Sequence, residues 1–295
     1  MQSCVIFNPA AKGQKAGRFR NILDSISREV QLKRTSCPGD ARRLAAEAVN
    51  EGFETIFAAG GDGTLNEVLN GIGDVPDGFE RVRLGVLPLG TINVFARELG
   101  IPLSPEAAWP VLREAGEIRM DLPCIESGLA DEKRRIYFAQ LAGAGLDARA
   151  IELVDWPLKK KIGPLAYVVA GLKAMRESQA DIKVADGAKI ISGQLMLIGN
   201  GTLYGGSYKI FPGASLNDGL LDVCIFPKVN WSLLLKCGMS LLLRKKLPEG
   251  CVMRLRTRSF SLGGHAAFEV DGELAGRLPA GVHVRPGGLR VLAPR

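Results

Sequence analysis

The stretch TIFAAGGDGTLNEVLNGI, residues 55–72, decides the fold. It opens with an apolar run that is typical of a buried strand, and it closes with Leu, Val and Ile at helical spacing. Between them lies Gly60-Gly61-Asp62-Gly63-Thr64, where glycines permit positive φ and bring backbone N–H groups close to a ligand. The helix start at Thr64-Leu65-Asn66 adds unpaired donors and the positive end of a helix dipole. We predict a phosphate-binding loop, and the alternative is a plain turn in which Asp62 caps the helix.

This loop differs from two common phosphate-binding patterns. No Gly-Lys-Ser/Thr follows it, so it is not a Walker A loop. Asn66 stands where the Rossmann fingerprint needs its third glycine. The distinguishing feature is the carboxylate of Asp62 at the centre of the loop, which can hold a magnesium ion or accept a proton.

Strand–loop–helix units flank this stretch on both sides. Apolar runs that each precede a helical pattern occur at Ser3–Phe7, Gln31–Thr35 and Leu84–Leu87. Asp40 stands where it can N-cap the second of these helices. Together with Thr55–Ala59, the runs predict a parallel sheet covered by helices on both faces.

Two further loops are expected at the same sheet edge, because ligands bind beyond the carboxyl ends of parallel strands. The loop Asn8–Gly13 offers an amide, the cation of Lys12 and a flexible glycine, and the loop Gly90–Asn93 offers a hydroxyl and an amide. Each of these loops, taken alone, also fits a simple turn or cap. We predict that they converge with Gly60–Thr64 on one composite site.

The pattern changes after Met120. Strand-like runs then follow one another at residues 118–125, 135–142, 182–185, 190–198, 220–226, 252–258 and 266–270, with helical inserts near 148–175 and 231–243. Such a succession predicts a second, mainly antiparallel β domain. We therefore divide the chain into residues 1–121 and 122–287, and a last strand within 288–295 fits either domain.

Three motifs in this second half allow more than one interpretation. Gly143–Ala148 fits the pattern G-x-G-x-x-A, but its antiparallel surroundings favour a structural turn over dinucleotide binding. Asn217-Asp218-Gly219 is typical of a hairpin turn, and its carboxylate could alternatively serve a magnesium ion. Asp271-Gly272-Glu273 ends a strand whose alternation puts Glu269 and Asp271 on one face. Its two carboxylates can act as base and orienting group, or the turn is purely structural.

Composition narrows the class of protein. The 295 residues are 46% hydrophobic and 23% charged, which indicates a globular chain rather than a disordered one. The six cysteines show no CxxC spacing and there are only two histidines, so a structural zinc site is not expected and a reduced, cytoplasmic enzyme fits. We expect neither a membrane-spanning helix nor an export signal, because no apolar stretch is long enough and a strand-like run begins at once.

The charge balance allows an anionic partner, such as a phosphometabolite, a membrane surface or nucleic acid, without selecting one of them. Lys and Arg number 38 against 31 Asp and Glu, a net charge of +7. Only 6% of the residues are aromatic and no basic segment interleaves them, so nucleic acid is not expected. The basic clusters are Lys159–Lys161, Arg244–Lys246 and the alternating Arg254, Arg256 and Arg258. They are interpreted as solvated faces, with contact to an anionic membrane leaflet as the alternative.

The ordered set of motifs resembles the diacylglycerol kinase catalytic-domain family, and its bacterial lipid kinases above all. The segments that carry the resemblance are Asn8-Pro9, Gly60–Val68, Pro88–Asn93, Gly143–Asp147, Tyr204–Gly206, Pro212–Asp222 and Asp271–Glu273. They span nearly the whole chain. The resemblance implies an α/β nucleotide-binding domain and a β-sandwich domain, with the active site in the cleft between them.

The resemblance also implies which residues form the site. Contacts to ATP would fall on Asn8, Pro9, Ala10, Ala11, Lys12, Thr35, Gly60, Gly61, Asp62, Gly63, Thr64, Leu65, Asn66 and Thr91. A structural magnesium site would use Asp218 with backbone oxygens of Ser215 and Leu220. The proton acceptor would come from the turn at 271–273, with Glu273 as the first choice and Asp271 as the second.

One position departs from the family pattern. Many bacterial relatives read Gly-Thr-x-Asn-Asp-Phe-Ala, whereas this chain has Val94 in place of the second polar residue. The loss of that carboxylate removes one indirect contact to the catalytic magnesium ion. Asp62 would then carry more of the metal binding, and the substrate does not follow from the bacterial relatives that keep the carboxylate.

The resulting hypothesis is an ATP- and magnesium-dependent lipid kinase of phospholipid metabolism that phosphorylates a hydroxyl of a membrane lipid such as diacylglycerol. It would be cytoplasmic, with peripheral contact at the inner face of the membrane. The alternatives are a soluble-metabolite kinase of the NAD kinase type, which shares the glycine–aspartate loop, and a non-catalytic lipid or nucleotide sensor. The sequence leaves the acceptor lipid and the oligomeric state open, a homodimer included.

Overall fold

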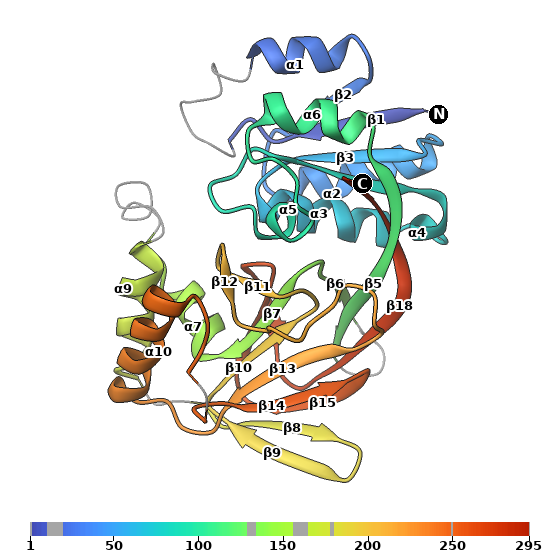
Figure 1. Cartoon of the computed structure of the whole chain (residues 1–295). Helices are drawn as coiled ribbons and strands as arrows, with labels where there is room; N and C mark the ends of the chain where they lie inside the picture. The colour runs from blue at the N-terminus through green and yellow to red at the C-terminus, as the bar shows by residue number, and fades with distance from the viewer. Residues whose placement is uncertain are drawn as a thin grey trace.

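In the computed structural model, which describes residues 2–10, 20–128, 134–155, 165–177, 180–248 and 250–294, the first part of the chain alternates strands and helices. The elements are β1 (Ser3–Phe7), α1 (Arg20–Ser27), β2 (Gln31–Arg34), α2 (Asp40–Asn50), β3 (Thr55–Gly60), α3 (Asp62–Gly73), α4 (Gly78–Arg81), β4 (Arg83–Pro88), α5 (Val94–Glu98) and α6 (Pro105–Arg113). The strands pair in parallel in the order β2-β1-β3-β4. Figure 1 shows α1 and α6 on one side of this sheet and α2, α3 and α4 on the other. The predicted parallel sheet with helices on both faces is confirmed.

The central strands are apolar along their whole length because both of their faces are covered. Every residue of β3 is buried, and Cys4–Phe7 of β1 is buried as well. Val68 and Leu69 of α3 pack into the same core, which fixes the helix that begins at the glycine loop. The sequence pattern therefore sets where the loop Gly60–Thr64 leaves the sheet.

The remaining elements are mostly antiparallel strands. They are β5 (Gly116–Ser127), β6 (Arg134–Tyr137), β7 (Leu141–Gly145), α7 (Leu146–Glu152), α9 (Leu165–Ala174), β8 (Ile182–Asp186), β9 (Lys189–Gly193), β10 (Leu195–Gly199), β11 (Leu203–Tyr204), β12 (Tyr208–Lys209), β13 (Leu221–Phe226), α10 (Trp231–Arg244), β14 (Met253–Thr257), β15 (Ser259–Gly264), β16 (Ala267–Val270), β17 (Glu273–Arg277) and β18 (Ala280–Ala293). Six of them form a second sheet, in the order β14-β13-β10-β7-β16-β17. Its inner side chains, such as Met196 and Phe268, share a core with Val184 and Phe260 of the first sheet. This packing of two sheets confirms the predicted β-sandwich.

Two long strands, β5 and β18, connect the α/β part to the β-sandwich (Figure 1). β18 pairs in parallel with β4 through Val291 and Leu84, and it pairs antiparallel with β5 and β15. The last strand predicted by the sequence is thus the end of β18 and rejoins the first sheet. The chain segment at Asp121–Pro123, where the sequence pattern changes, lies inside β5.

Two of the predicted strands are each divided into two strands in the structure. The run 135–142 divides into β6 and β7, because the N–H groups of Ala139, Gln140 and Leu141 donate to the carboxylate of Asp271. The run 190–198 also divides, at Gln194, and its halves β9 and β10 belong to different sheets. These breaks depend on partners far away in the sequence, so local periodicity could not predict them.

The start of α2 differs from the prediction. Asp40 is the first residue of the helix rather than its N-cap, and its carboxylate accepts hydrogen bonds from Ser36 in the preceding loop. The N–H groups of Gly39 and Ala41 instead donate to the carboxylate of Glu67 on α3, both at 3.0 Å. Glu67 therefore ties α2 to the helix that starts at the glycine loop.

Candidate active site

The loops at the carboxyl ends of β1, β3 and β4 touch one another. The side-chain amide of Asn8 donates to Oγ1 of Thr64 at 3.1 Å. The carbonyl oxygen of Gly60 accepts from the N–H groups of Leu89 and Gly90 at 2.8 and 3.1 Å. At the end of β2, the N–H of Thr35 donates to the carbonyl of Phe7 at 2.9 Å. The predicted convergence of these loops is confirmed.

The glycines of this site permit close approach rather than unusual backbone angles. The expectation of positive φ at Gly60, Gly61 and Gly63 is wrong, since none of the three adopts it. A methyl group added at Gly60 would overlap the Thr64 side chain, and one added at Gly90 would lie 2.5 Å from Cα of Gly61. Side chains here would push the loops apart, so the glycines keep them in contact.

Asp62 lies at the junction of two helix starts. It is the first residue of α3, and its carboxylate accepts hydrogen bonds from the N–H groups of Asn93, Val94 and Phe95 at the start of α5. The pKa of Asp62 is raised to about 6, first by burial and then by the nearby carboxylate of Asp271, while the hydrogen bonds oppose the rise. A partly buried carboxylate beside a second acid favours the binding of a hard cation.

Val94 contributes its backbone to the site and its side chain to the core. The side chain is buried, while the N–H hydrogen-bonds to Asp62. The preceding residue, Asn93, has a φ of 53° and its side chain bridges the N–H and carbonyl of Gly90 at 3.0 and 2.9 Å. The loop thus keeps its shape without a carboxylate at position 94.

The two carboxylates of the turn Asp271-Gly272-Glu273, here called the acidic turn, have opposite surroundings. Asp271 is buried with a φ of 48°, and it accepts from the N–H groups of residues 139–141 at 2.8 to 3.1 Å and from the amide of Asn66 at 3.1 Å. Glu273 is exposed, and a methyl group added at Gly63 would lie 2.7 Å from its Oε1. The acidic turn therefore presents Glu273 directly to the glycine loop, whereas four donors occupy Asp271.

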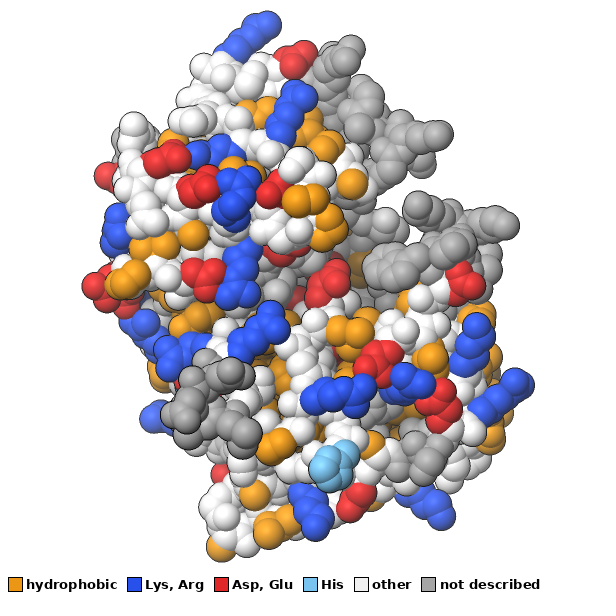
Figure 2. All heavy atoms as spheres, turned by 180° about the vertical axis from the view of Figure 1, so that it is seen from behind, with side chains coloured by type: hydrophobic (Ala, Val, Ile, Leu, Met, Phe, Trp, Pro, Cys, Tyr) orange, Lys and Arg blue, Asp and Glu red, His pale blue; other side chains and the backbone are white. Residues whose placement is uncertain are grey.

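These contacts cross between the two parts of the molecule. Asn66 on α3 donates to Asp271 and to the carbonyl of Tyr137, both at 3.1 Å, so its side chain is used within the protein. The side chain of Leu65 is buried in the core, so the backbone is the part of Leu65 that is left for a ligand. Seen from behind, the surface is indented between the α/β part and the β-sandwich, and an acidic side chain lies in the indentation (Figure 2).

Sequence reasoning missed a pair of buried carboxyl groups beneath the acidic turn. Asp147 Oδ2 and Glu269 Oε1 both border the space that Gly143 leaves, and burial raises the pKa of both groups, most strongly that of Glu269. Glu269 also accepts from the N–H of Gly272 at 2.7 Å, and the hydroxyl of Tyr204 donates to Asp147. Glu269 pairs across the sheet with Gly143, whose missing side chain leaves space for both carboxyl groups. The sequence carries no signal for this pair, because it depends on the register of β16 against β7.

The other predicted residues have different positions. Ala11, Lys12 and the cluster Lys159–Lys161 lie outside the described residues. Pro9 and Ala10 are exposed beside Asn8, whose side-chain oxygen accepts from the N–H of Ala10 at 2.9 Å. Thr91 is exposed in the loop that follows β4.

The predicted structural magnesium site lies in the turn before β13. Asp218 forms an ion pair with Arg256 and accepts from the N–H of Leu220 at 3.0 Å, while Oγ of Ser215 hydrogen-bonds to Asn217. The guanidinium group already supplies positive charge to Asp218, so a magnesium ion would have to compete with it. The magnesium site of Asp218 with the backbone oxygens of Ser215 and Leu220 stays a prediction.

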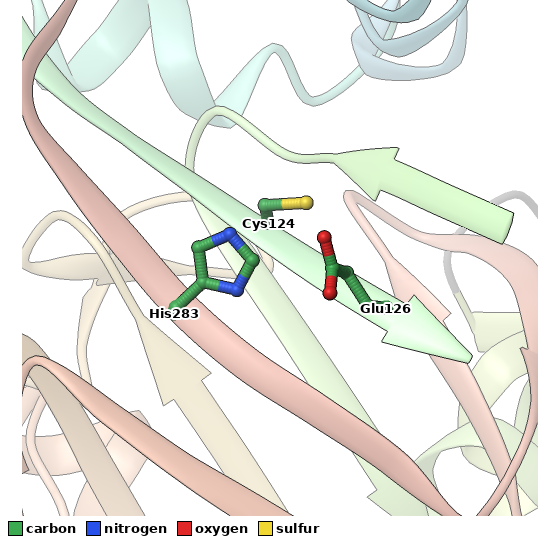
Figure 3. Close-up of side chains that lie close together, drawn as sticks. All are labelled: Cys124, Glu126 and His283. Atoms are coloured by element: carbon green, nitrogen blue, oxygen red, sulfur yellow. The ribbon is translucent and has the colours of Figure 1, made fainter. Parts of the chain in front are cut away.

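A second group of metal-ligand types lies on the first sheet, away from the loops. Among the residues that the structure describes, Cys124, Glu126 and His283 form the one cluster whose ligand atoms lie within 4.8 Å of one another (Figure 3). Cys124 and Glu126 alternate along β5 and His283 faces Cys124 on β18, so the sheet register alone brings them together. Burial raises the pKa of the Cys124 thiol to about 12, and Glu126 pairs with Arg135 at 2.7 Å. Neither residue is prepared to bind a metal ion.

Comparison with known families identifies both parts of the chain. Residues 2–125 match the diacylglycerol kinase catalytic domain, and residues 140–293 match the YegS C-terminal NAD kinase beta sandwich-like domain. The fold and the loops at its sheet edge thus define a two-part protein of the kinase class. The chain belongs to the diacylglycerol kinase catalytic-domain family.

Individual relatives cover almost the whole chain. The diacylglycerol kinase of Staphylococcus saprophyticus is 30% identical over 287 residues, which are 93% of this chain and 90% of that protein. The diacylglycerol kinase of Staphylococcus aureus strain MRSA252 is 30% identical over 288 residues, 94% of this chain and 87% of that protein. The crystal structure of a diacylglycerol kinase from Bacillus anthracis has the same fold, with a TM-score of 0.74 and 22% identity over 99% of this chain and 96% of that one. Across the described part of this chain, the helices are too short or too polar to cross a bilayer.

Proposed function

We propose that this protein is an ATP-dependent lipid kinase that transfers the γ-phosphoryl group to a hydroxyl of a membrane lipid such as diacylglycerol. The observation that carries the proposal is the contact between Glu273 and Gly63. An exposed carboxylate from the β-sandwich lies against the loop predicted to bind phosphate, so a proton acceptor and a phosphoryl donor would meet there. The relatives named as diacylglycerol kinases support a lipid as the acceptor.

The nucleotide would bind along the glycine loop. Backbone N–H groups at the start of α3 and the amide of Asn8 can donate to the phosphate oxygens of ATP. Asp62 would hold a magnesium ion. Its carboxylate is ionised at pH values above its pKa of about 6, and the carboxylate of Asp271 adds negative charge beside it. When bound, the ion would neutralise charge that develops on the transferred phosphoryl group.

Glu273 would accept the proton of the lipid hydroxyl. As the hydroxyl oxygen bonds to the γ-phosphorus atom, the bond from phosphorus to the leaving oxygen of ADP breaks and the proton passes to Glu273. Asp271 is unsuited to this step, since its two oxygens already accept four hydrogen bonds within the fold. Its role would be to hold the acidic turn against α3.

An apolar cavity beside the acidic turn would receive the lipid chains. The cavity has a volume of about 260 Å³ and lies between the second sheet and the helices α7, α9 and α10. Its lining is largely apolar, with side chains such as Leu197, Phe226 and Leu234, while Asp147 and Tyr204 supply polar groups. Asp147 connects the cavity lining to the acidic turn: its carboxyl group borders the same space beside Gly143 as that of Glu269, and Glu269 accepts from the N–H of Gly272.

The test is phosphoryl transfer from labelled ATP to a panel of diacylglycerol, phosphatidylglycerol, a sphingoid base and NAD, with products identified by mass spectrometry. We expect a phosphorylated lipid, and at least a roughly 100-fold loss with Asp62→Asn. Asp77→Asn, an exposed acid at the start of α4, is the matched control and should keep full activity. Labelled NAD phosphate would favour the metabolite kinase instead. Binding of lipid and ATP with no product would favour the sensor.

A further inference from the structure

The outer face of α10 carries an unusual apolar stripe. Five large apolar side chains recur there at helical spacing, and all of them are exposed, Leu235 at 69% and Leu243 at 75%. They are Trp231, Leu235, Met239, Leu242 and Leu243. Among the described residues these are half of the ten large apolar side chains that are exposed. Such concentration on one short helix indicates a face that another surface covers.

The opposite face of the same helix lines the apolar cavity that would receive the lipid chains. Four side chains on this inner face line the cavity together with Gly171 of α9, namely Leu233, Leu234, Cys237 and Leu241. Figure 1 shows α10 beside α9 at the outer edge of the β-sandwich. A helix that is apolar on both faces separates the cavity from whatever covers its outer face.

The charge along α10 and its flanks is predominantly positive. The segment from residue 227 to 248 contains five basic residues and no Asp or Glu, and Glu249 follows it. All five basic side chains are exposed, namely Lys228, Lys236, Arg244, Lys245 and Lys246. The arginines of β14, for which membrane contact is the alternative interpretation, are engaged within the fold: Arg256 pairs with Asp218 and Asp222, and Arg254 donates to the carbonyl of Ile210 at 3.0 Å.

The helix is held firmly at both ends. The side chain of Asn230 caps its start by accepting from the N–H of Leu233 at 2.9 Å. At its end Lys245 has a φ of 55°, and its carbonyl accepts from the N–H of Lys209 at 2.8 Å, which ties α10 to β12. The apolar stripe and its basic border therefore keep a fixed orientation on the β-sandwich.

We propose that the outer face of α10 docks on an anionic lipid bilayer, with the apolar stripe inserted at the level of the headgroups and the basic side chains on lipid phosphates. Exposed apolar side chains bordered by cations fit an anionic leaflet better than a protein surface of mixed charge. The inference rests on the proposed function, because a lipid acceptor is what brings the enzyme to a bilayer. Docking there puts the cavity behind α10 next to the lipid that it would receive.

Co-sedimentation with vesicles tests the docking face. The full chain is mixed with vesicles of phosphatidylcholine alone, or of phosphatidylcholine with about one third phosphatidylglycerol. We expect binding that rises with phosphatidylglycerol and falls as salt is added. The double variant Leu235→Gln/Leu243→Gln should bind roughly 10- to 100-fold more weakly. Lys245→Gln should weaken binding about fivefold at low salt.

Ile190→Gln is the matched control. Ile190 is 67% exposed, similar to Leu235, but lies on β9, the edge strand of the first sheet. Its variant should bind vesicles as the unchanged chain does. Equal losses for Ile190→Gln and the double leucine variant, or no loss for either, would overturn the proposal. A dimer of the unchanged chain that becomes a monomer in the double leucine variant would also overturn it, since the face would then join two copies.

Activity on a dispersed substrate separates this proposal from the proposed function. With a short-chain diacylglycerol kept below its micelle concentration, the double leucine variant should turn over as fast as the unchanged chain. Vesicle binding without phosphorylation of any lipid would contradict the proposed kinase function but not the proposed docking of α10. If lipid is phosphorylated but the leucine changes do not affect vesicle binding, the kinase function would be supported and the docking of α10 contradicted.

Discussion

The acidic residues around the candidate site form two layers whose surroundings differ. The outer layer, Asp62 and Glu273, is at least partly accessible and faces the loops predicted to bind phosphate. The inner layer, Asp271, Asp147 and Glu269, is enclosed and hydrogen-bonded within the protein. The residue types are the same, and neighbours in the chain such as Asp271 and Glu273 belong to different layers.

The hydrogen-bond partners of each carboxylate decide its role. A carboxylate whose lone pairs are filled by protein N–H groups holds the backbone, as Asp271 does for residues 139–141. A carboxylate that reaches an open loop can exchange a proton or bind a cation. We therefore expect outer-layer changes to lower activity, and inner-layer changes that leave a hydrogen-bonding group without a partner to lower stability.

The largest expected effect is on catalysis at Glu273. Glu273→Gln should lower turnover by about 10²- to 10⁴-fold, because the amide cannot accept the hydroxyl proton. The melting temperature and the KM for ATP should stay close to those of the unchanged chain, since the side chain is exposed. Steady-state kinetics at saturating lipid, beside a thermal melt, measures both. Glu106→Gln, an exposed acid on α6, is the control.

Asp271→Asn should show the opposite pattern. One carboxylate oxygen becomes an NH₂ group that faces two N–H donors, so we expect a loss of about 2–4 kcal/mol in the free energy of unfolding. That loss corresponds to a melting temperature lower by roughly 5–15 °C. Turnover of the folded fraction should fall less than tenfold. An inactive Asp271→Asn beside a fully active Glu273→Gln would reverse the assignment of the base.

The folded protein should become more stable when the charge of Asp62 is removed. Its pKa of about 6 in the folded chain lies above the ordinary value of 3.8, so its stabilising contribution is full below about pH 4 and is lost as the pH rises through 6. Asp62→Asn never ionises. Its melting temperature should therefore match the unchanged chain near pH 4 and exceed it at pH 7, by an amount equivalent to about 1–2 kcal/mol.

The measurement for Asp62 is a series of thermal melts across this pH range in a chelating buffer. Adding magnesium and ADP should then stabilise the unchanged chain and leave Asp62→Asn nearly unaffected, because the carboxylate would hold the ion. A variant that melts lower than the unchanged chain at pH 7 would mean that Asp62 serves mainly as a cap for α5. Equal stabilisation of both by magnesium would place the metal elsewhere.

The sequence predicted the outer layer better than the inner one. The strand–loop–helix units are set by local periodicity, and parallel pairing then brings Asn8, Gly60–Thr64 and Gly90 to one edge without further information. The role expected for the glycines was wrong in detail, since their absent side chains matter through contacts between loops rather than through φ.

The inner layer depends on contacts between distant parts of the chain. Asp271 meets residues about 130 positions earlier, and it breaks what local alternation predicts as one strand. Glu269 meets Asp147 only because β16 pairs with β7 in a register that sets Glu269 opposite Gly143. Periodicity carries no information on that register, so an alternating pattern could identify the acids but not their partners.

The smallest expected effect, and the sharpest test of the inner layer, concerns the pair Asp147 and Glu269. If Glu269 holds a proton that it donates to Asp147, Glu269→Gln replaces that O–H with an N–H and still accepts from Gly272. Asp147→Asn likewise keeps an acceptor for Tyr204 and turns its donor toward Glu269. Each single variant should thus change the free energy of unfolding by less than about 1 kcal/mol.

The double variant Asp147→Asn/Glu269→Gln should behave differently. Two NH₂ groups would then face each other with no acceptor between them, so we expect a loss of about 1–3 kcal/mol beyond the sum of the single variants. Urea unfolding of the four chains at pH 7 gives this coupling free energy directly. Additive effects would mean that the two carboxyl groups do not share a proton. If each single variant is clearly more stable than the unchanged chain, both carboxyl groups are ionised and repel each other. The pair would then contribute charge repulsion rather than a shared proton.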